Sequence, residues 1–205
     1  MKKIMFNDKY GLTQAVLEGK KTMTRRIAAE LNHPLIEHIS EWGQDEKGRA
    51  MLSVRYSTGL YNDVYPYYQI GEIVAVAQSY KAVRNIIGDG IHDGRCIKFE
   101  EGWNNKMFVR ADLMPNRIRI TDIKLERLQD ISEIDCIKEG IYDEKGVMAG
   151  LDDYWAFTFD SSPRTYYTAR EAFAALIDKV SGRRGTWDAN PYVFAYSFEL
   201  IKDKL

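Results

Sequence analysis

Gly19-Lys20-Lys21-Thr22-Met23-Thr24-Arg25-Arg26 is the segment from which both the architecture and the chemistry of this chain can be argued. It combines four cations with two threonine hydroxyls. Gly19 suits the left-handed conformation that ends many helices, and residues 22–27 favour an extended chain. The segment therefore predicts a helix end, a corner and the start of a strand.

A short helix is expected immediately before this segment. Leu12, Ala15 and Val16 follow one another at the i, i+3, i+4 spacing of a helix face. Asp8 is placed to cap the start of this helix, and residues 2–6 have the composition of a first strand. The chain is thus predicted to begin as strand, helix and strand.

The corner itself suggests a chemical function. In a strand, Thr22, Thr24 and Arg26 share one face, so Lys21 reaches Thr24 from the corner. A neutral lysine can take the proton of a threonine hydroxyl as that oxygen attacks a carbonyl. The pKa of a free lysine is about 10.4, and crowding by cations together with partial burial lowers it. The alternative is that the four cations form only a solvated basic edge.

The composition limits the classes of function. With 205 residues, 45% of them hydrophobic, we expect one domain spanning residues 1–205. A net charge of −1 excludes a uniformly basic nucleic-acid-binding protein, so phosphate contacts must come from a local patch. Cys96 and Cys136 are too few for a disulfide scaffold or a zinc site. We expect a cytoplasmic protein with no membrane segment, no metal and no cofactor.

The hydrophobic pattern predicts an α+β protein. Ser132 is expected to cap a helix that Gly140 ends, and residues 170–180 have the pattern of an amphipathic helix. Residues 71–77 form a nearly continuous apolar run, which is typical of a central strand buried on both faces. The other expected elements are a helix within 31–42 and strands at 51–56, 117–125 (cations outward) and 192–201.

Three segments lack a regular pattern and are expected to be long loop insertions, at about 29–68, 84–106 and 142–168. Residues 56–68 are rich in tyrosine, whose rings can stack on a nucleobase or fold back on the core. The last insertion is acidic and contains Trp155, Phe157 and Phe159, which indicates partial packing.

Four blocks of the chain resemble the ASCH domain, in the longer versions that phages and prophages often carry. The blocks follow the order of the family, and the resemblance extends over roughly half of the chain. The resemblance implies a PUA-like fold, a small mixed β-barrel with short helices at its rim and a basic cleft suited to RNA or a modified base. The blocks are residues 19–26, 71–74, 125–132 with 139–140, and 187–193.

The resemblance also implies a catalytic set. Some ASCH proteins are amidohydrolases that remove the acetyl group of N4-acetylcytidine with a lysine, a threonine and a glutamate. Block-to-block alignment places these residues at Lys21, Thr24 and Glu139. Lys21 would deprotonate Thr24, whose oxygen attacks the amide carbonyl, and Glu139 would activate the water that releases the acyl group. Arg26, on the face of Thr24, or a backbone N–H at the corner would stabilise the oxyanion.

Three functions remain open from the sequence. We favour recognition of RNA or of a modified nucleobase or nucleoside in a basic cleft, with hydrolysis of an N-acyl amide as an addition. The alternatives are a non-catalytic RNA-binding module and a phage accessory protein that binds a protein partner through the aromatic residues of the last insertion. The expected contacts to nucleic acid or substrate are Lys20, Thr22, Arg25, Arg26, Arg117 and Arg119.

Overall fold

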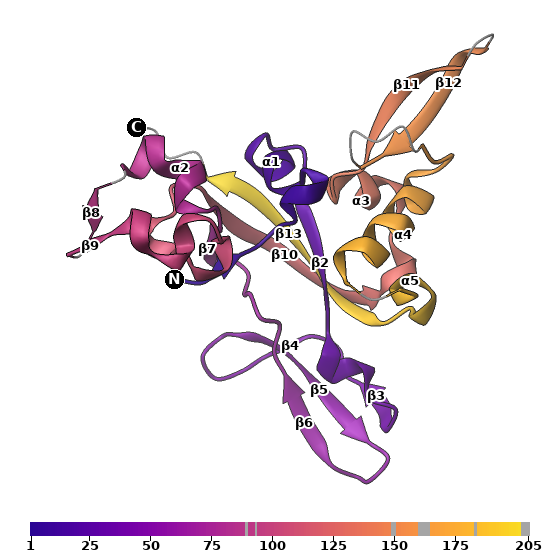
Figure 1. Ribbon diagram of the computed structural model, residues 1–205. Coiled ribbons are helices and arrows are strands. Elements are labelled where there is room, and N and C mark those ends of the chain that lie inside the picture. The colour runs from indigo at the N-terminus through magenta and orange to yellow at the C-terminus, as the bar shows by residue number, and fades with distance from the viewer. Residues whose placement is uncertain (89, 93, 149–150, 160–164, 183, 202–205) are drawn as a thin grey trace.

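A five-stranded sheet forms the centre of the molecule (Figure 1). The structure, a computed structural model, describes residues 1–88, 90–92, 94–148, 151–159, 165–182 and 184–201, with residues 144–148 and 151–156 described by their backbone alone. The first strand pairs with its neighbour in parallel, and the other pairs are antiparallel. In spatial order the strands are β1 (Lys3–Ile4), β7 (Ile73–Val76), β10 (Arg117–Arg127), β13 (Tyr192–Ile201) and β2 (Met23–Ile27).

The long strand β10 confirms the alternating pattern of its sequence. Ile118 and Ile120 are buried, whereas the side chains of Arg117 and Arg119 are not. The register against β13 shifts between Ile120 and Asp122, at the position where the hydrophobic phase of the sequence changes. Residues 71–77 contain the inner strand β7, which pairs with both β1 and β10. Since Val74, Ala75 and Val76 are 0% exposed, the expected burial on both faces is confirmed, although β10 occupies the middle position of the sheet.

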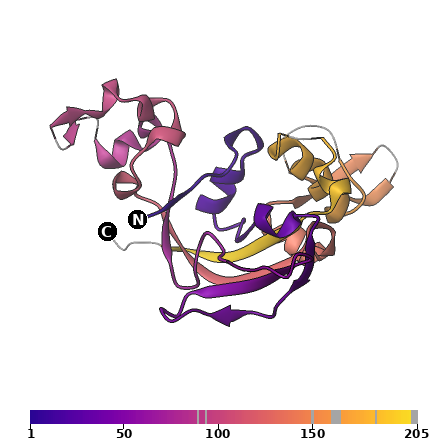
Figure 2. The ribbon, with the colours of Figure 1, turned by 90° about the horizontal axis from the view of Figure 1, so that it is seen from below.

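The short helices that accompany the sheets confirm the mixed α+β class. The Ser132 side chain accepts a hydrogen bond from the Asp135 N–H, and Gly140 follows the helix with a φ of 103°. Figure 2 shows α1 and α4 on the side of β10 and β13 opposite to the β5–β6 hairpin. The helices are α1 (Leu12–Leu17), α2 (Tyr80–Ile87), α3 (Glu133–Lys138), α4 (Ala169–Val180) and α5 (Thr186–Ala189).

The cap expected for the first helix is wrong. Gly11 and not Asp8 precedes α1, and the side chain of Asn7 caps the single turn η1 (Asp8–Tyr10) that comes before it. The Asp8 carboxylate instead accepts a hydrogen bond of 2.5 Å from the hydroxyl of Thr13. The predicted end of the helix is confirmed, since Gly19 has a φ of 74°.

The first expected insertion is folded into a sheet. It contains η2 (Ala29–Asn32), β3 (Ile36–Ile39), β4 (Gly43–Gln44), β5 (Ala50–Tyr56) and β6 (Tyr61–Val64). The helix predicted within residues 31–42 is wrong, because Ile36–Ile39 pairs with β5. The part Tyr61–Val64 of the expected tyrosine-rich loop is likewise a strand, β6, which also pairs with β5. Leu52, Val54 and Val64 of this sheet join the main core.

The region from Tyr80 to Met114, which contains the second expected insertion at 84–106, is also largely structured. It builds a small second core around Tyr80, Val83, Ile97 and Met114. The Lys3 amine of β1 donates to the carbonyls of Met107 (2.6 Å) and Val109 (2.7 Å), which ties this region to the main sheet. Its elements after α2 are β8 (Ile91–His92), β9 (Arg95–Cys96), η3 (Ile97–Phe99), η4 (Glu101–Trp103), η5 (Lys106–Phe108) and η6 (Ala111–Leu113); η7 (Leu128–Asp130) follows β10.

The last expected insertion begins with the hairpin of β11 (Tyr142–Met148) and β12 (Leu151–Thr158), which projects from the body of the molecule (Figure 1). Phe159 is 3% exposed and contacts the ring of Tyr10, and Phe157 is half-buried. The side chain of Trp155 lies outside the described residues. Phe157 and Phe159 therefore do not form the exposed aromatic patch that a protein-docking function requires of them.

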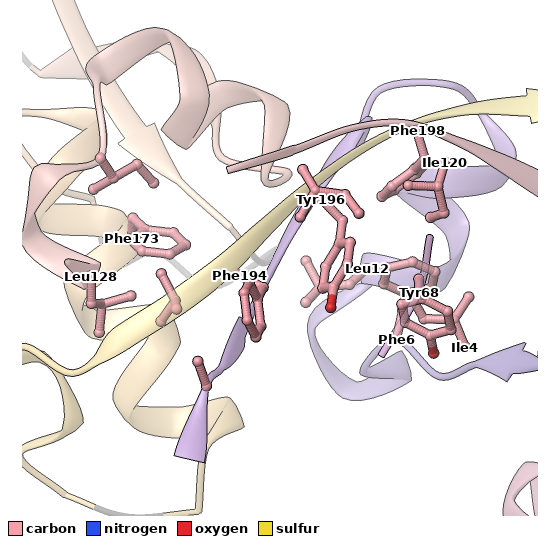
Figure 3. Packing of buried hydrophobic residues seen from close by; sticks show 14 of the residues in the cluster. Ile4, Phe6, Leu12, Tyr68, Ile120, Leu128, Phe173, Phe194, Tyr196 and Phe198 are labelled. Atoms are coloured by element: carbon pink, nitrogen blue, oxygen red, sulfur yellow. The ribbon is translucent and has the colours of Figure 1, made fainter. Parts of the chain in front are cut away.

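The main core fixes the N-terminal segment against the last strand. Phe6 contacts Phe198 with ring centroids 5.7 Å apart, and Tyr68 meets Tyr196 at 5.3 Å (Figure 3). The buried Tyr196 hydroxyl accepts a hydrogen bond from the Tyr67 N–H. Residues near Phe6 are thereby held at the edge of β2, where they form one wall of the cavity described below. Within the described ranges, no helix is both long and apolar enough to cross a membrane.

The two cysteines differ in accessibility, which gives a simple check of the core. Burial raises the pKa of the Cys136 thiol to about 12, whereas Cys96 is only half-buried. Because the thiolate is the reactive form, we expect an aromatic disulfide reagent at pH 8 to modify Cys96 in the native protein. Cys136 should react only after addition of denaturant. Equal reaction rates of both thiols in the native protein would contradict the packing of α3.

Candidate functional site

A cavity of about 650 Å³ lies between the N-terminal segment, β2, the end of α3 and the inner face of α4. Lys21, Thr24 and Glu139 all line it. The structure thus brings together the three residues that the resemblance assigns to catalysis, although they come from two distant parts of the chain. Of these three residues, Lys21 and Glu139 are hydrogen-bonded to each other.

Among the described residues, Glu139 accepts both hydrogen bonds of the Lys21 amine. Its Nζ donates to the carboxylate Oε2 and to the backbone carbonyl of Glu139, both at 2.6 Å. The side chains are 2% and 6% exposed. The Thr22 N–H donates to the Lys138 carbonyl at 2.9 Å, which holds the corner before β2 against the end of α3. A buried lysine requires such a partner, because an unpaired buried charge is strongly unfavourable.

Gly140 makes room for this pair. A Cβ at position 140 would lie 3.2 Å from Leu12 Cδ2 and 3.6 Å from Lys21 Cδ, and the φ of 103° disfavours any other residue. Gly140 therefore serves both the end of α3 and the placement of the lysine.

Burial lowers the pKa of Lys21 below its ordinary value of 10.5. Glu139 acts in the opposite direction, and Arg26 and Arg25 add smaller lowering contributions. The direction agrees with the sequence-based expectation. The main physical cause does not, because complete burial of the amine has a larger effect than crowding by cations.

Thr24 presents its hydroxyl to the cavity. The residue is 5% exposed and lies opposite Tyr196 in the ladder between β2 and β13. Within the described part of the chain, its hydroxyl makes no hydrogen bond to the protein, including to the Lys21 amine. Proton transfer between the two therefore needs a change of side-chain rotamer or one intervening water.

Arg25 does not face a substrate as the sequence suggested. Its side chain is 1% exposed, although part of it reaches the cavity wall. The guanidinium binds Glu126 at 2.7 Å, Glu139 at 3.1 Å and Asp135 at 3.4 Å. Its hydrogen-bonding capacity is thus directed toward carboxylates of the protein.

Arg26 is the predicted contact that remains available at the cavity. Its Nη2 donates to the Met5 carbonyl at 2.7 Å, and its guanidinium lies 6.0 Å from the centre of the Phe6 ring. Among the described residues no carboxylate pairs with it. Arg26 therefore provides a positive charge at the rim on which an oxyanion or a polar substrate group can be bound.

The remaining predicted contacts lie outside the cavity. Lys20 is exposed and pairs with Glu18 at 2.6 Å, and the backbone N–H of Thr22 donates to the Lys138 carbonyl at the corner before β2. Arg117 and Arg119 are on β10, where Arg119 pairs with Glu199 of β13 at 3.0 Å. The six predicted contacts are therefore not gathered in one basic groove.

Sequence reasoning missed three parts of the cavity. The ring of Phe6 lies 5.8 Å from the Lys21 amine, and Phe173 and Leu176 of α4 form an apolar wall. Lys106, from a segment without a recognisable pattern, pairs with Asp8 at 2.7 Å at the rim. Of these parts, only the helix at residues 170–180 has a recognisable sequence pattern, its amphipathic face. That pattern indicates packing against a core and does not indicate a functional site.

No group of three or more His, Cys, Asp or Glu side chains in the described ranges is arranged to hold a metal ion. Comparisons of the chain with models of known protein families, with curated proteins and with solved structures found no match.

Proposed function

We propose that this protein is an amidohydrolase that removes an acyl group from the exocyclic nitrogen of a modified nucleobase or nucleoside, as the resemblance to the ASCH domain implies. One observation carries the proposal. An amine bonded at 2.6 Å to a carboxylate 118 positions later in the chain, and a threonine hydroxyl without a protein partner among the described residues, line the same cavity. These are the groups that an acyl-enzyme mechanism needs.

The hydrogen bonds of Lys21 suit the neutral amine. A neutral amine has two hydrogens and one lone pair. Both hydrogens can be donated to Glu139, to its carbonyl and to its carboxylate. The lone pair then remains to accept the proton of Thr24, and the lowered pKa of Lys21 favours this form.

In the proposed reaction, Thr24 Oγ attacks the amide carbonyl carbon while its proton passes to Lys21. Arg26 binds the oxyanion of the tetrahedral intermediate. The intermediate collapses with cleavage of the C–N bond, and Lys21 returns the proton to the departing exocyclic nitrogen. A water activated by Glu139 then attacks the threonine ester, which releases the carboxylic acid and restores the hydroxyl.

The cavity favours a nucleoside over a long RNA. Its volume of about 650 Å³ falls within the range of small-molecule sites. A flat heterocycle can lie against the apolar side chains of Phe173 and Leu176, with its polar groups toward Arg26. Arg117 and Arg119, which an extended RNA contact would use, lie outside the cavity.

The resemblance also implies a PUA-like barrel, which we include in the proposal. The antiparallel run of β7, β10, β13 and β2 supports it, together with α1 and α4, which lie on one side of β10 and β13 (Figure 2).

The test is to incubate the purified protein with a panel of N-acylated nucleosides that includes N4-acetylcytidine, N6-acyladenosines and N2-acylguanosines. Free acid and deacylated nucleoside are followed by liquid chromatography with mass spectrometry. We expect release by the wild type and by the matched control Lys20→Ala, and its loss in Lys21→Ala. Absence of product from every compound with the wild type would reject the proposal.

A further inference from the structure

Arg25 occupies the centre of a buried cluster of charges at the back of the cavity. Its Nε and Nη2 bind Glu126 of β10 at 2.7 Å, and Nη2 also approaches Asp135 of α3 at 3.4 Å. Its Nη1 donates to Oε1 of Glu139 at 3.1 Å. One guanidinium on β2 thus connects the long central strand to both ends of α3.

The carboxylate of Glu139 is held at its two oxygens by two different side chains. Oε2 accepts from the Lys21 amine at 2.6 Å, and Oε1 accepts from Arg25 at 3.1 Å. A carboxylate bonded at one oxygen can rotate about its Cγ–Cδ bond, whereas bonds at both oxygens fix its plane. The position of the Lys21 amine, which makes both of its hydrogen bonds to Glu139, depends on that plane.

We propose that Arg25 is a positioning residue, which orients Glu139 and through it the Lys21 amine toward Thr24. This inference rests on the proposed hydrolase function. Arg25 takes no part in bond making or breaking, since its donors are directed to carboxylates of the protein.

A lysine could not replace Arg25 in this arrangement. The planar guanidinium presents five N–H donors in a fixed geometry, which suits simultaneous contact with three carboxylates. A lysine ammonium keeps the positive charge but is a single point on a flexible chain. Arg25→Lys therefore keeps the charge of the buried cluster and loosens the orientation of Glu139.

The experiment compares Arg25→Lys with the matched control Arg119→Lys, which alters an exposed arginine paired with Glu199 outside the cavity. With a nucleoside that the wild type hydrolyses, we expect kcat of Arg25→Lys to fall by about 10- to 100-fold while KM changes by less than about threefold. Both parameters of Arg119→Lys should be unchanged. An unchanged kcat of folded Arg25→Lys would overturn the inference.

A second readout needs no substrate and separates this inference from the proposed function. Limiting acetic anhydride is added to each protein, and the acetylation of Lys21 relative to the exposed Lys20 is measured by peptide mass spectrometry. In Arg25→Lys the Glu139 carboxylate is no longer fixed by the guanidinium, so it holds the Lys21 amine less firmly. The ratio should therefore rise by about fivefold or more in Arg25→Lys and not in Arg119→Lys. An unchanged ratio overturns the inference, and if the wild type hydrolyses nothing, this ratio alone decides it. A denaturation curve of each variant confirms that the folded protein is measured.

Discussion

Thr24→Ala is expected to lower kcat for an acylated nucleoside by about 10⁴-fold or more, because it removes the nucleophile of the proposed reaction. The free energy of unfolding should change by no more than about 1 kcal/mol. The hydroxyl makes no protein hydrogen bond within the described part of the chain, so none is lost. Product release gives kcat, and urea denaturation gives the stability.

Thr22→Ala is the matched control, since Thr22 lies two positions earlier and outside the cavity. We expect it to keep the kcat of the wild type. A slowly hydrolysed substrate should also leave one acyl group on the peptide that contains Thr24 in the wild type, and not in Thr24→Ala. Turnover by Thr24→Ala at the rate of the wild type would exclude Thr24 as the nucleophile.

Lys21→Met is expected to reduce the free energy of unfolding by about 1–3 kcal/mol, because it removes the donor of two buried hydrogen bonds to the carboxylate and the carbonyl of Glu139. Among the described residues, Glu139 would keep Arg25 as its cationic partner. The double variant Lys21→Met with Glu139→Gln also replaces the buried carboxylate by a neutral amide, so it should be more stable than Lys21→Met alone. Urea denaturation of the four proteins gives the coupling energy directly. If the effects of the two substitutions are additive, Lys21 and Glu139 are not energetically coupled.

The free energy of unfolding of the same four proteins should depend on pH. The pKa of Lys21 is lowered in the folded protein, so the unfolded chain binds more protons between that lowered pKa and the ordinary value of 10.5. The contribution of Lys21 to stability is therefore fully present above 10.5 and is lost as the pH falls through the folded-state pKa. The difference in stability between the wild type and Lys21→Met should grow as the pH rises across this window. A difference independent of pH would contradict the lowered pKa.

Elements with strong local signals were predicted well. Strand 192–201 and the helix near 170–180 follow from unbroken hydrophobic patterns, and Ser132 and Gly140 mark the two ends of α3. In each case the information lies within a few neighbouring residues, through periodicity or a cap.

The first insertion was predicted poorly because its structure depends on pairing between distant segments. Leu35, Ile36 and Ile39 have a spacing that fits a helix, yet Ile36–Ile39 forms a strand against β5. Tyr61–Val64 joins the same sheet although residues 56–68 appear loop-like in composition. Local propensity is a weak guide where cross-strand contacts determine the conformation.

The candidate site was likewise predicted in part. Lys21 and Thr24 stand in one short segment, and their proximity follows from the corner before β2. Glu139 could be placed only through the resemblance. The environment of Arg25 was not predictable, because its partners Glu126, Asp135 and Glu139 lie 101, 110 and 114 positions away. In the sequence, two adjacent arginines without an acidic residue next to them suggest side chains that face solvent or bind phosphate. Only the fold shows that three carboxylates surround Arg25.

The order of the strands has a consequence for the growing polypeptide. Within the described sheet, β2 lies at the edge and pairs only with β13, which comes much later in the sequence. The nucleophile of the proposed reaction thus remains on a strand without a partner until residues 192–201 have left the ribosome. A nascent chain, or a product truncated before β13, would carry Lys21 and Thr24 without an assembled centre, which would keep it catalytically silent.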